Sequence, residues 1–184
     1  TGAIAAWENA CRLEADGRFG KNGMRVYVAQ NSPFTLMYDA WKADSRALPE
    51  ITPEEGRCKS ERILATVLSN RKPPYSLAGG LYDVLKASNG DFFLASNNDI
   101  IYWMMQFRNR EGYDLLPAAC VAVAALAQAV KDGTVKKDEY IMLNCTGGGV
   151  LGAKSRGYVL KEPDLVLSPD LPAEEIVKAV SELF

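Results

Sequence analysis

Hydrophobic and polar positions along this chain follow two alternating patterns. In some segments apolar residues recur every three to four positions, which predicts amphipathic helices. Others are short runs rich in β-branched and aromatic residues, which predict strands. Helices are expected over residues 3–15, 33–41, 54–68, 80–86, 98–107, 115–130 and 171–184, and strands over residues 24–29, 91–96, 140–145 and 165–167.

The order of these elements predicts the fold class. Strands and helices alternate with short connections, which is typical of an α/β fold. We predict an open, twisted, mostly parallel sheet with helices on both faces. Residues 1–150 are expected to form one domain, followed over 151–184 by a tail with one amphipathic helix. The polar stretch 44–56 is predicted to be an exposed crossover, and the proline-rich stretch 69–76 an irregular loop.

The segment from Leu115 to Val130 is almost entirely apolar, with Pro117 in its first turn. It is short for a membrane span, which needs about 20 residues. Its many alanines suit close helix packing. We therefore predict a buried helix and no membrane partner. Gly79 and Gly80 are interpreted as helix-packing glycines.

Composition excludes several classes of function. The formal net charge is -2 and the basic residues are scattered, so nothing favours nucleic acid as a partner. The chain has no histidine, which excludes a Ser-His-Asp triad or a histidine-ligated metal within it. The chain has four cysteines without CxxC spacing, Cys11, Cys58, Cys120 and Cys145. Three of them lie within apolar segments, where reduced core cysteines are found, so we predict reduced thiols, no metal site and a cytoplasmic location.

A glycine triplet follows the expected strand 140–145. Thr146 would place a hydroxyl at the carboxyl end of that strand, where open α/β sheets bind ligands. Gly147, Gly148 and Gly149 would let the backbone approach a bound group closely, because no Cβ stands in the way. The alternative for Thr146 is a hydroxyl that caps its own turn.

The chain opens on Thr1-Gly2, which is typical of a glycine loop that leads into a helix. Free N–H groups at the start of a helix attract anions such as phosphate. A strand and further glycines normally precede this motif, and the chain has no initiator Met. We therefore expect a carboxyl-terminal part of a longer protein. A short mature protein that starts at Thr1 is the alternative.

The loop 69–76 carries charge suited to an anionic substrate. Arg71 and Lys72 offer cations, and Tyr75 and Ser76 offer hydroxyls. Arg71 and Lys72 could instead be a solvated pair beside a proline turn. This loop, the Thr1-Gly2 start and the glycine triplet are expected to meet at the carboxyl edge of the sheet.

Several segments of residues 1–150, taken in their order along the chain, resemble the carboxyl-terminal half of fold type II pyridoxal-phosphate enzymes of the threonine synthase group. Within that group they most resemble the cysteate synthase branch. Residues after Gly149 match no pattern of that group. The resemblance is carried by residues 1–7, 29–31, 33–34, 67–71, 73–76, 79–80, 116–119, 143–144 and 146–149.

The resemblance implies pyridoxal 5'-phosphate as cofactor. Thr1 and Gly2 fall on the last positions of the loop that binds the cofactor phosphate. Thr146, followed by Gly147, falls where the family places a hydroxyl on the pyridine nitrogen. Such a neutral partner favours β-elimination and replacement. The Schiff-base lysine is implied to lie in an amino-terminal half, so no catalytic residue is assigned to this chain.

The implied reaction replaces the phosphate of O-phospho-L-serine by sulfite to give L-cysteate. Arg71, with Lys72 and Ser76, would hold the departing phosphate or the entering sulfite. The implied partners are the phosphorylated amino acid, sulfite, the protein's own amino-terminal half and further copies of the protein. The isolated chain is expected to be inactive.

Two positions depart from threonine synthases, which usually carry a bulkier polar residue at Gly148 and an acidic residue at Leu116. Both departures favour the cysteate synthase branch. The alternatives are threonine synthesis or another lyase reaction on a phosphorylated amino acid, and a non-catalytic α/β module that binds a phosphate-bearing ligand.

Overall fold

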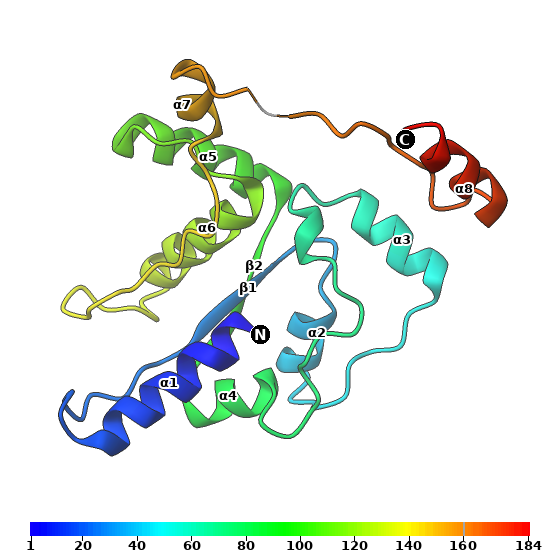
Figure 1. Ribbon diagram of the computed structural model, residues 1–184. Helices are drawn as coiled ribbons and strands as arrows, with labels where there is room; N and C mark the ends of the chain where they lie inside the picture. The colour runs from blue at the N-terminus through cyan, green and yellow to red at the C-terminus, as the bar shows by residue number, and fades with distance from the viewer. Residues whose placement is uncertain (160) are drawn as a thin grey trace. The chain divides into compact units, whose positions relative to one another are not determined.

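A computed structural model describes residues 1–159 and 161–184 (Figure 1). The chain divides into two compact units, Thr1–Val150 and Leu151–Phe184. In chain order the elements are α1 Gly2–Asp16, β1 Tyr27–Asn31, α2 Leu36–Lys42, α3 Pro53–Glu61, the short 3-10 helix η1 Thr66–Leu68, α4 Leu81–Ala87, β2 Asp91–Ala95, α5 Asn97–Glu111, α6 Pro117–Lys131, α7 Val150–Ser155 and α8 Ala173–Ser181.

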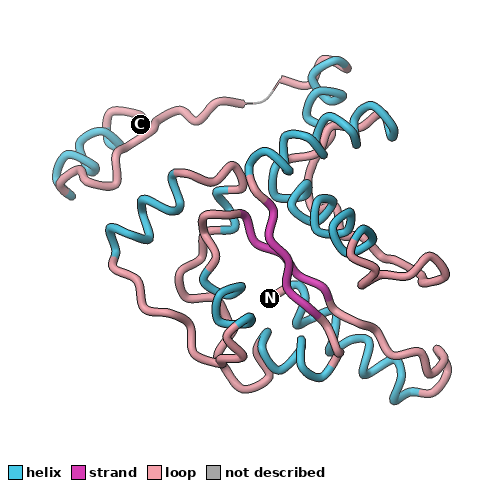
Figure 2. Tube along the Cα trace, turned by 180° about the vertical axis from the view of Figure 1, so that it is seen from behind, coloured by secondary structure: helices cyan, strands magenta, loops and turns pink. Residues whose placement is uncertain are grey.

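The first unit is built around a parallel pair of strands, β1 and β2, with Ala29 opposite Phe93. Successive side chains of a strand point to opposite faces, so each face serves a different set of helices. Ala29 and Phe93 pack against α6, while Val28 and Phe92 pack on the side of α2 and α4. Figure 2 shows the two strands running between these groups of helices. The predicted α/β class and parallel pairing are confirmed.

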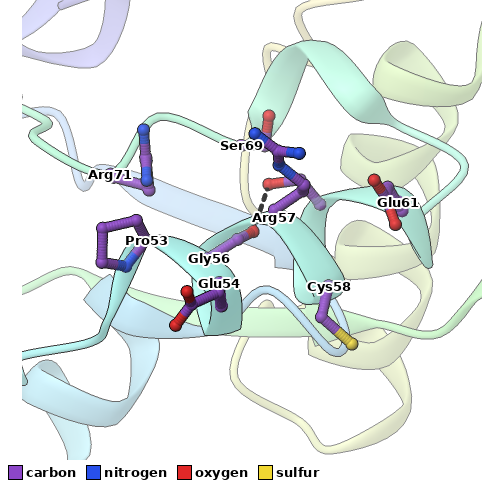
Figure 3. Close-up of a pocket in the computed structure, with 9 residues that line it drawn as sticks. Pro53, Glu54, Gly56, Arg57, Cys58, Glu61, Ser69 and Arg71 are labelled. Carbon is purple, nitrogen blue, oxygen red and sulfur yellow. Dashed lines mark hydrogen bonds between the residues drawn. The ribbon is translucent and has the colours of Figure 1, made fainter. Parts of the chain in front are cut away.

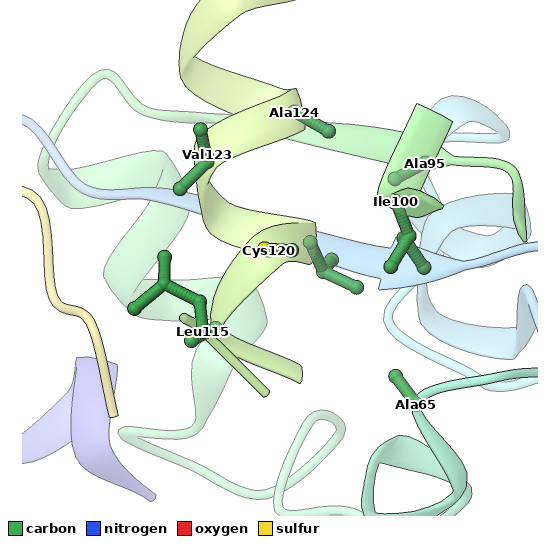
Figure 4. Close-up of a cluster of buried hydrophobic side chains, with 9 residues drawn as sticks. Ala65, Ala95, Ile100, Leu115, Cys120, Val123 and Ala124 are labelled. Atoms are coloured by element: carbon green, nitrogen blue, oxygen red, sulfur yellow. The ribbon is translucent and has the colours of Figure 1, made fainter. Parts of the chain in front are cut away.

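Helix α6 forms the centre of the core, as the apolar run predicts. Pro117 occupies its first turn, where the missing N–H is harmless. Cys120 is fully buried among Ile100, Leu115 and Ala95 (Figure 4). Burial raises the pKa of the Cys120 thiol to about 11. Among the described residues, no helix has both the length and the apolar character needed to cross a bilayer.

The expectation of three core cysteines is wrong. Cys11, Cys58 and Cys145 are exposed, Cys120 alone is buried, and all four are free thiols. Cys11 is exposed because α1 packs against the core through its first two turns, at Ala3, Ile4 and Trp7. The later part of its predicted apolar stripe projects into solvent.

Two expected strands are not formed in the described part of the chain. Residues 140–145 have no regular secondary structure and pair with no strand of the described chain, and Tyr140 and Met142 are exposed. Leu143 still packs against the cluster around Leu115. Residues 165–167 likewise lack strand pairing. β-propensity favours extended backbone, but a strand also needs a partner.

The second unit contains the amphipathic helix that the sequence predicts. Helix α8 has Glu174 and Glu175 in its first turn, where acidic side chains complement the helix dipole. Val177 and Val180 of this helix are exposed, whereas Ile176 is partly buried.

Helix α2 begins at Leu36 and not at Pro33 as predicted. The buried Gln30 side chain explains this start. Its Oε1 accepts hydrogen bonds from the N–H groups of Met37 at 3.0 Å and Tyr38 at 2.9 Å. A tertiary contact from β1 therefore satisfies the first turn of the helix.

An acid-sensitive contact joins β2 to α2. The Asp91 carboxylate accepts hydrogen bonds from Trp41 Nε1 at 2.7 Å and from Lys42 Nζ at 2.9 Å. Burial raises the pKa of Asp91, but the Lys42 ammonium, the Phe92 N–H and the Trp41 indole outweigh burial. They hold that pKa below its ordinary value of 3.8.

A carboxyl group whose pKa is lowered by folding stabilises the protein above its unfolded pKa, and this stability is lost as the pH falls through the folded pKa. We expect the free energy of unfolding to decline below about pH 4, and Asp91→Asn to make that decline shallower. Urea unfolding between about pH 6 and about pH 3 measures it. Asp138→Asn, at an exposed position, is the control; equal pH dependence in Asp91→Asn and wild type would refute the expectation.

Candidate functional site

A cavity of about 680 Å³ lies between α3 and the loop that follows η1 (Figure 3). Arg71 enters it from the loop and Arg57 from α3. In Figure 3 both guanidinium groups lie above α3, while the Glu54 carboxylate and the Cys58 thiol lie below it. The cavity has the size of a small-molecule site, about 300–1,000 Å³. Its lining residues are Pro53, Glu54, Gly56, Arg57, Cys58, Ser60, Glu61, Ser69 and Arg71.

Gly56 allows Arg71 to lie directly against α3. A Cβ built on Gly56 would stand 2.6 Å from Arg71 Cδ, closer than carbon atoms can approach. A glycine inside a helix is less favourable than alanine by about 1 kcal/mol. The close packing of the Arg71 stem gives this buried glycine a structural role.

The chain leading to Arg71 is anchored by two asparagines at the carboxyl ends of the strands. Asn31 is 1% exposed. Its Nδ2 donates to Ala95 O at 3.0 Å and to Asn97 Oδ1 at 3.1 Å, and its Oδ1 accepts from the N–H of Ala65 at 3.0 Å. Asn97 holds the same segment, accepting from the N–H of Leu64 at 3.1 Å. We call Asn31 and Asn97 the amide junction.

The amide junction corrects the predicted helix over 54–68. Helix α3 ends at Glu61, and only the short η1 follows. Asn97 Nδ2 donates a hydrogen bond to the Arg62 carbonyl oxygen at 2.8 Å. Backbone groups that would continue the helix are therefore bound by side chains from the sheet edge. Of the apolar residues in this segment, Ile63 is buried, whereas Leu64 and Val67 are exposed.

The remaining residues of the loop 69–76 have different environments. Lys72 and Ser76 are exposed, and their side chains are open to solvent. Tyr75 is fully buried, and its hydroxyl donates to Ser45 O at 3.1 Å. Burial raises the pKa of Tyr75 to about 12. The expectation that Tyr75 offers a hydroxyl to substrate is therefore wrong, because this hydroxyl serves the core.

Gly79 and Gly80 shape the turn before α4 and are not helix-packing glycines. Gly79 has a φ of +71°, in the left-handed region that favours glycine. A Cβ on Gly80 would stand 2.7 Å from the Leu77 carbonyl oxygen. Glycine is therefore needed at Gly79 because of its positive φ, and at Gly80 because backbone carbonyl groups of the preceding loop lie close to it.

The glycine triplet lies beside the segment before α6. Leu115 forms an antiparallel bridge with Gly148, and the N–H of Gly149 donates to Asp114 O at 2.7 Å. A Cβ on Gly148 would stand 2.3 Å from that same oxygen. At Gly148, the close approach that the sequence predicts is made to the protein's own backbone. Gly147 and Thr146 line the adjoining hollow of about 470 Å³.

Gly148→Ala is expected to destabilise the protein by about 2 kcal/mol, because the new methyl group overlaps backbone that cannot move aside. Gly147→Ala is the matched control. Its Cβ would meet Leu116 Cδ1 at 2.9 Å, and this half-exposed side chain can rotate away. Urea unfolding of both variants measures the difference. Equal stability of the two variants would contradict the role given to Gly148.

The Thr146 hydroxyl makes no hydrogen bond to protein groups within the described residues, so its expected turn-capping alternative is not seen. This hydroxyl can donate a hydrogen bond to a ligand or accept one from it. Cys145, its neighbour in the sequence, is also exposed. Thr146 itself is exposed.

The first turn of α1 offers backbone N–H groups. Thr1 is its N-cap and makes no side-chain capping bond, and the first turn has no acidic residue. A Cβ on Gly2 would meet nothing within 4 Å. Open space beside unpaired N–H groups suits a phosphate group. Ala3 and Ile4 fix this turn against the cluster that contains Tyr75.

The chemistry available here is binding of anions by cations and N–H groups. Within the residues that the structure describes, no cluster of carboxylates and thiols could hold a metal ion. The structure groups Arg71 with Arg57 and Ser69, and Thr146 with the glycine triplet. The meeting of all three loops at one sheet edge stays a prediction.

Sequence reasoning missed Gly56, Arg57 and Asn97. A signal was present for Gly56, since a glycine inside a predicted helix often marks a close approach. Asn97 carried no local signal, because its partners lie far away in the sequence.

These features define an α/β chain with an arginine-lined cavity beside a parallel sheet and a glycine loop in contact with the core. Comparison with curated proteins gives the particular resemblance: the chain is similar to proteins named cysteate synthase. It is 42% identical over 179 residues to that of Methanosarcina acetivorans and 44% identical over 183 residues to that of Methanocella paludicola. The predicted resemblance is confirmed.

These alignments cover 96% and 98% of this chain and 43% of each relative. The cysteate synthase of Methanoregula boonei is 45% identical over 150 residues, which cover 81% of the chain. The chain thus spans less than half the length of the relatives it matches. Coverage of 98% must include most of residues 151–184, so the expectation that the tail matches nothing is wrong. No family model matches the chain.

Proposed function

We propose that the full-length protein replaces the phosphate of O-phospho-L-serine by sulfite, giving L-cysteate and inorganic phosphate. The observation that carries this proposal is the 42% identity with the cysteate synthase of M. acetivorans over 96% of the chain. The arginine-lined cavity supports it, because phosphate and sulfite are both oxyanions that guanidinium groups bind well.

Arg71 is proposed to bind the oxyanion that leaves or enters. Its planar guanidinium presents several N–H donors in a fixed fork, which matches pairs of anionic oxygens. Lys72 and Ser76, exposed on the same loop, are proposed to complete the contact with a second cation and a hydroxyl. Positive charge here stabilises the phosphate as its bond to carbon breaks and its negative charge grows.

The chain is also proposed to hold pyridoxal 5'-phosphate. Thr1 and Gly2 would bind the cofactor phosphate at the open first turn of α1. Thr146 would hold its hydroxyl on the ring nitrogen and leave that nitrogen uncharged, and Gly147 would allow close approach beside it. When bound, the cofactor supplies the electron sink for breaking the bond to phosphate.

No lysine of this chain is proposed as the Schiff-base residue. That lysine is proposed to lie in the amino-terminal part of the full-length protein, and the full-length protein, this chain included, is proposed to have the fold type II arrangement. The isolated chain is therefore proposed to be inactive, and the full-length protein to work in the cytoplasm as a homo-oligomer. Free thiols at all four cysteines agree with a reducing compartment.

The test is product analysis with the purified full-length protein. O-phospho-L-serine and O-phosphohomoserine are each supplied with and without sulfite, and L-cysteate, threonine and inorganic phosphate are measured. We expect L-cysteate and phosphate in equal amounts only where O-phospho-L-serine and sulfite are both present. Threonine from O-phosphohomoserine would favour threonine synthesis instead.

A further inference from the structure

The cavity beside α3 contains a second cation that the proposed function has not used. Arg57 lies on α3 and lines the same cavity as Arg71. Both side chains are exposed. None of the ion pairs among the described residues involves either arginine. Two guanidinium groups that line one hollow carry like charges, which an anion bound between them would balance.

The neutral polar groups of the cavity have their protons committed elsewhere. Ser60 Oγ donates to Gly56 O at 2.7 Å, and Ser69 Oγ donates to Thr66 O at 2.6 Å. Each hydroxyl has one proton, so neither can donate to a ligand while these bonds last. The side-chain donors left for an anion are the guanidinium groups of Arg57 and Arg71.

Gly56 leaves room for the stem of one of these side chains, that of Arg71. Arg71 Cδ packs where a Cβ of residue 56 would stand, at 2.6 Å. The amide junction holds the segment that leads into the Arg71 loop, through the N–H of Ala65 at 3.0 Å. Arg57 follows Gly56 directly on α3 and lines the same cavity.

We propose that Arg57 and Arg71 form a clamp for a tetrahedral or pyramidal oxyanion, the phosphate of O-phospho-L-serine or sulfite, with Gly56 as the positioning residue that seats Arg71. The clamp deepens the proposed function and rests on it for the identity of the substrate. Glu54 and Glu61 also line the cavity, and their carboxylates oppose anion binding.

The experiment uses full-length protein at constant ionic strength, because salt screens exposed charges. Inorganic phosphate is titrated calorimetrically into wild type, Arg57→Gln, Gly56→Ala and Glu61→Gln. Arg62→Gln is the matched control, since Arg62 is an exposed arginine just past α3 that does not line the cavity.

We expect the phosphate dissociation constant to rise about tenfold in Arg57→Gln, through loss of a charge-assisted bond. It should fall in Glu61→Gln and stay unchanged in Arg62→Gln. In Gly56→Ala it should rise while thermal stability is kept or increased, because alanine favours the helix but displaces Arg71. Unchanged phosphate binding in Arg57→Gln would overturn the clamp.

Kinetics identify the anion. In Arg57→Gln, an increase of KM for O-phospho-L-serine alone assigns the clamp to the departing phosphate. An increase of KM for sulfite alone assigns it to the nucleophile. Unchanged KM values for both would overturn the proposal. If the wild type makes no L-cysteate, the proposed function fails, but the phosphate titration still decides whether the clamp exists.

Discussion

Asn31→Ala is expected to lower the free energy of unfolding by about 3 kcal/mol, among the largest effects of a single substitution in this chain. The change removes a buried amide that bridges β1, β2 and the segment before η1. The N–H of Ala65 then stays buried without its partner, and an unsatisfied buried donor costs about 1–3 kcal/mol. Urea unfolding followed by tryptophan fluorescence measures the loss.

The matched control for this prediction is Asn98→Ala. Asn98 is an exposed asparagine next to Asn97, and its removal should change stability by less than about 0.5 kcal/mol. A double-mutant cycle between Asn31 and Asn97 should show coupling, because the two amides share a hydrogen bond at 3.1 Å. Equal losses in Asn31→Ala and Asn98→Ala would show that the amide junction has no special role.

Arg71→Ala in the full-length protein is expected to raise KM for O-phospho-L-serine or sulfite about 10- to 100-fold, the range set by loss of a hydrogen bond to a charged group. The side chain is exposed and lines the cavity, so the fold should survive the change. Steady-state kinetics with each substrate varied separately measure the effect.

Two further variants make the Arg71 result specific. Arg71→Lys keeps the charge but loses the planar fork, and should recover part of the affinity. Arg62→Ala removes an arginine outside the cavity and should leave both KM values unchanged. Wild-type kinetics in Arg71→Ala would remove Arg71 from the substrate site.

The sequence predicted the elements whose signals are local. The buried α6 follows from a long apolar run opened by Pro117, and α1 from its stripe and from Gly17 beyond its end. The end of α3 could not be predicted, because it is set by Asn31 and Asn97, which are distant in sequence. The start of α2 was missed for the same reason, since Gln30 supplies its cap.

The candidate site was predicted in part. Arg71 was identified from the charge of its loop, but Arg57, which lines the same cavity, lay in the predicted helix over 54–68 and was not singled out. Tyr75 was misread because a hydroxyl in a loop sequence gives no sign of complete burial. The glycine triplet was recognised, but the backbone that Gly148 approaches could not be predicted, because Asp114 is distant in the sequence.

The unpaired stretch over residues 140–146 has a practical consequence for handling the 184-residue chain. The backbone of this stretch pairs with no strand of the described chain, and Tyr140 and Met142 are exposed. Another molecule can therefore add a strand to it. Concentrated preparations of the chain alone should therefore self-associate. A charged gatekeeper, Met142→Lys, should keep such samples monomeric for longer.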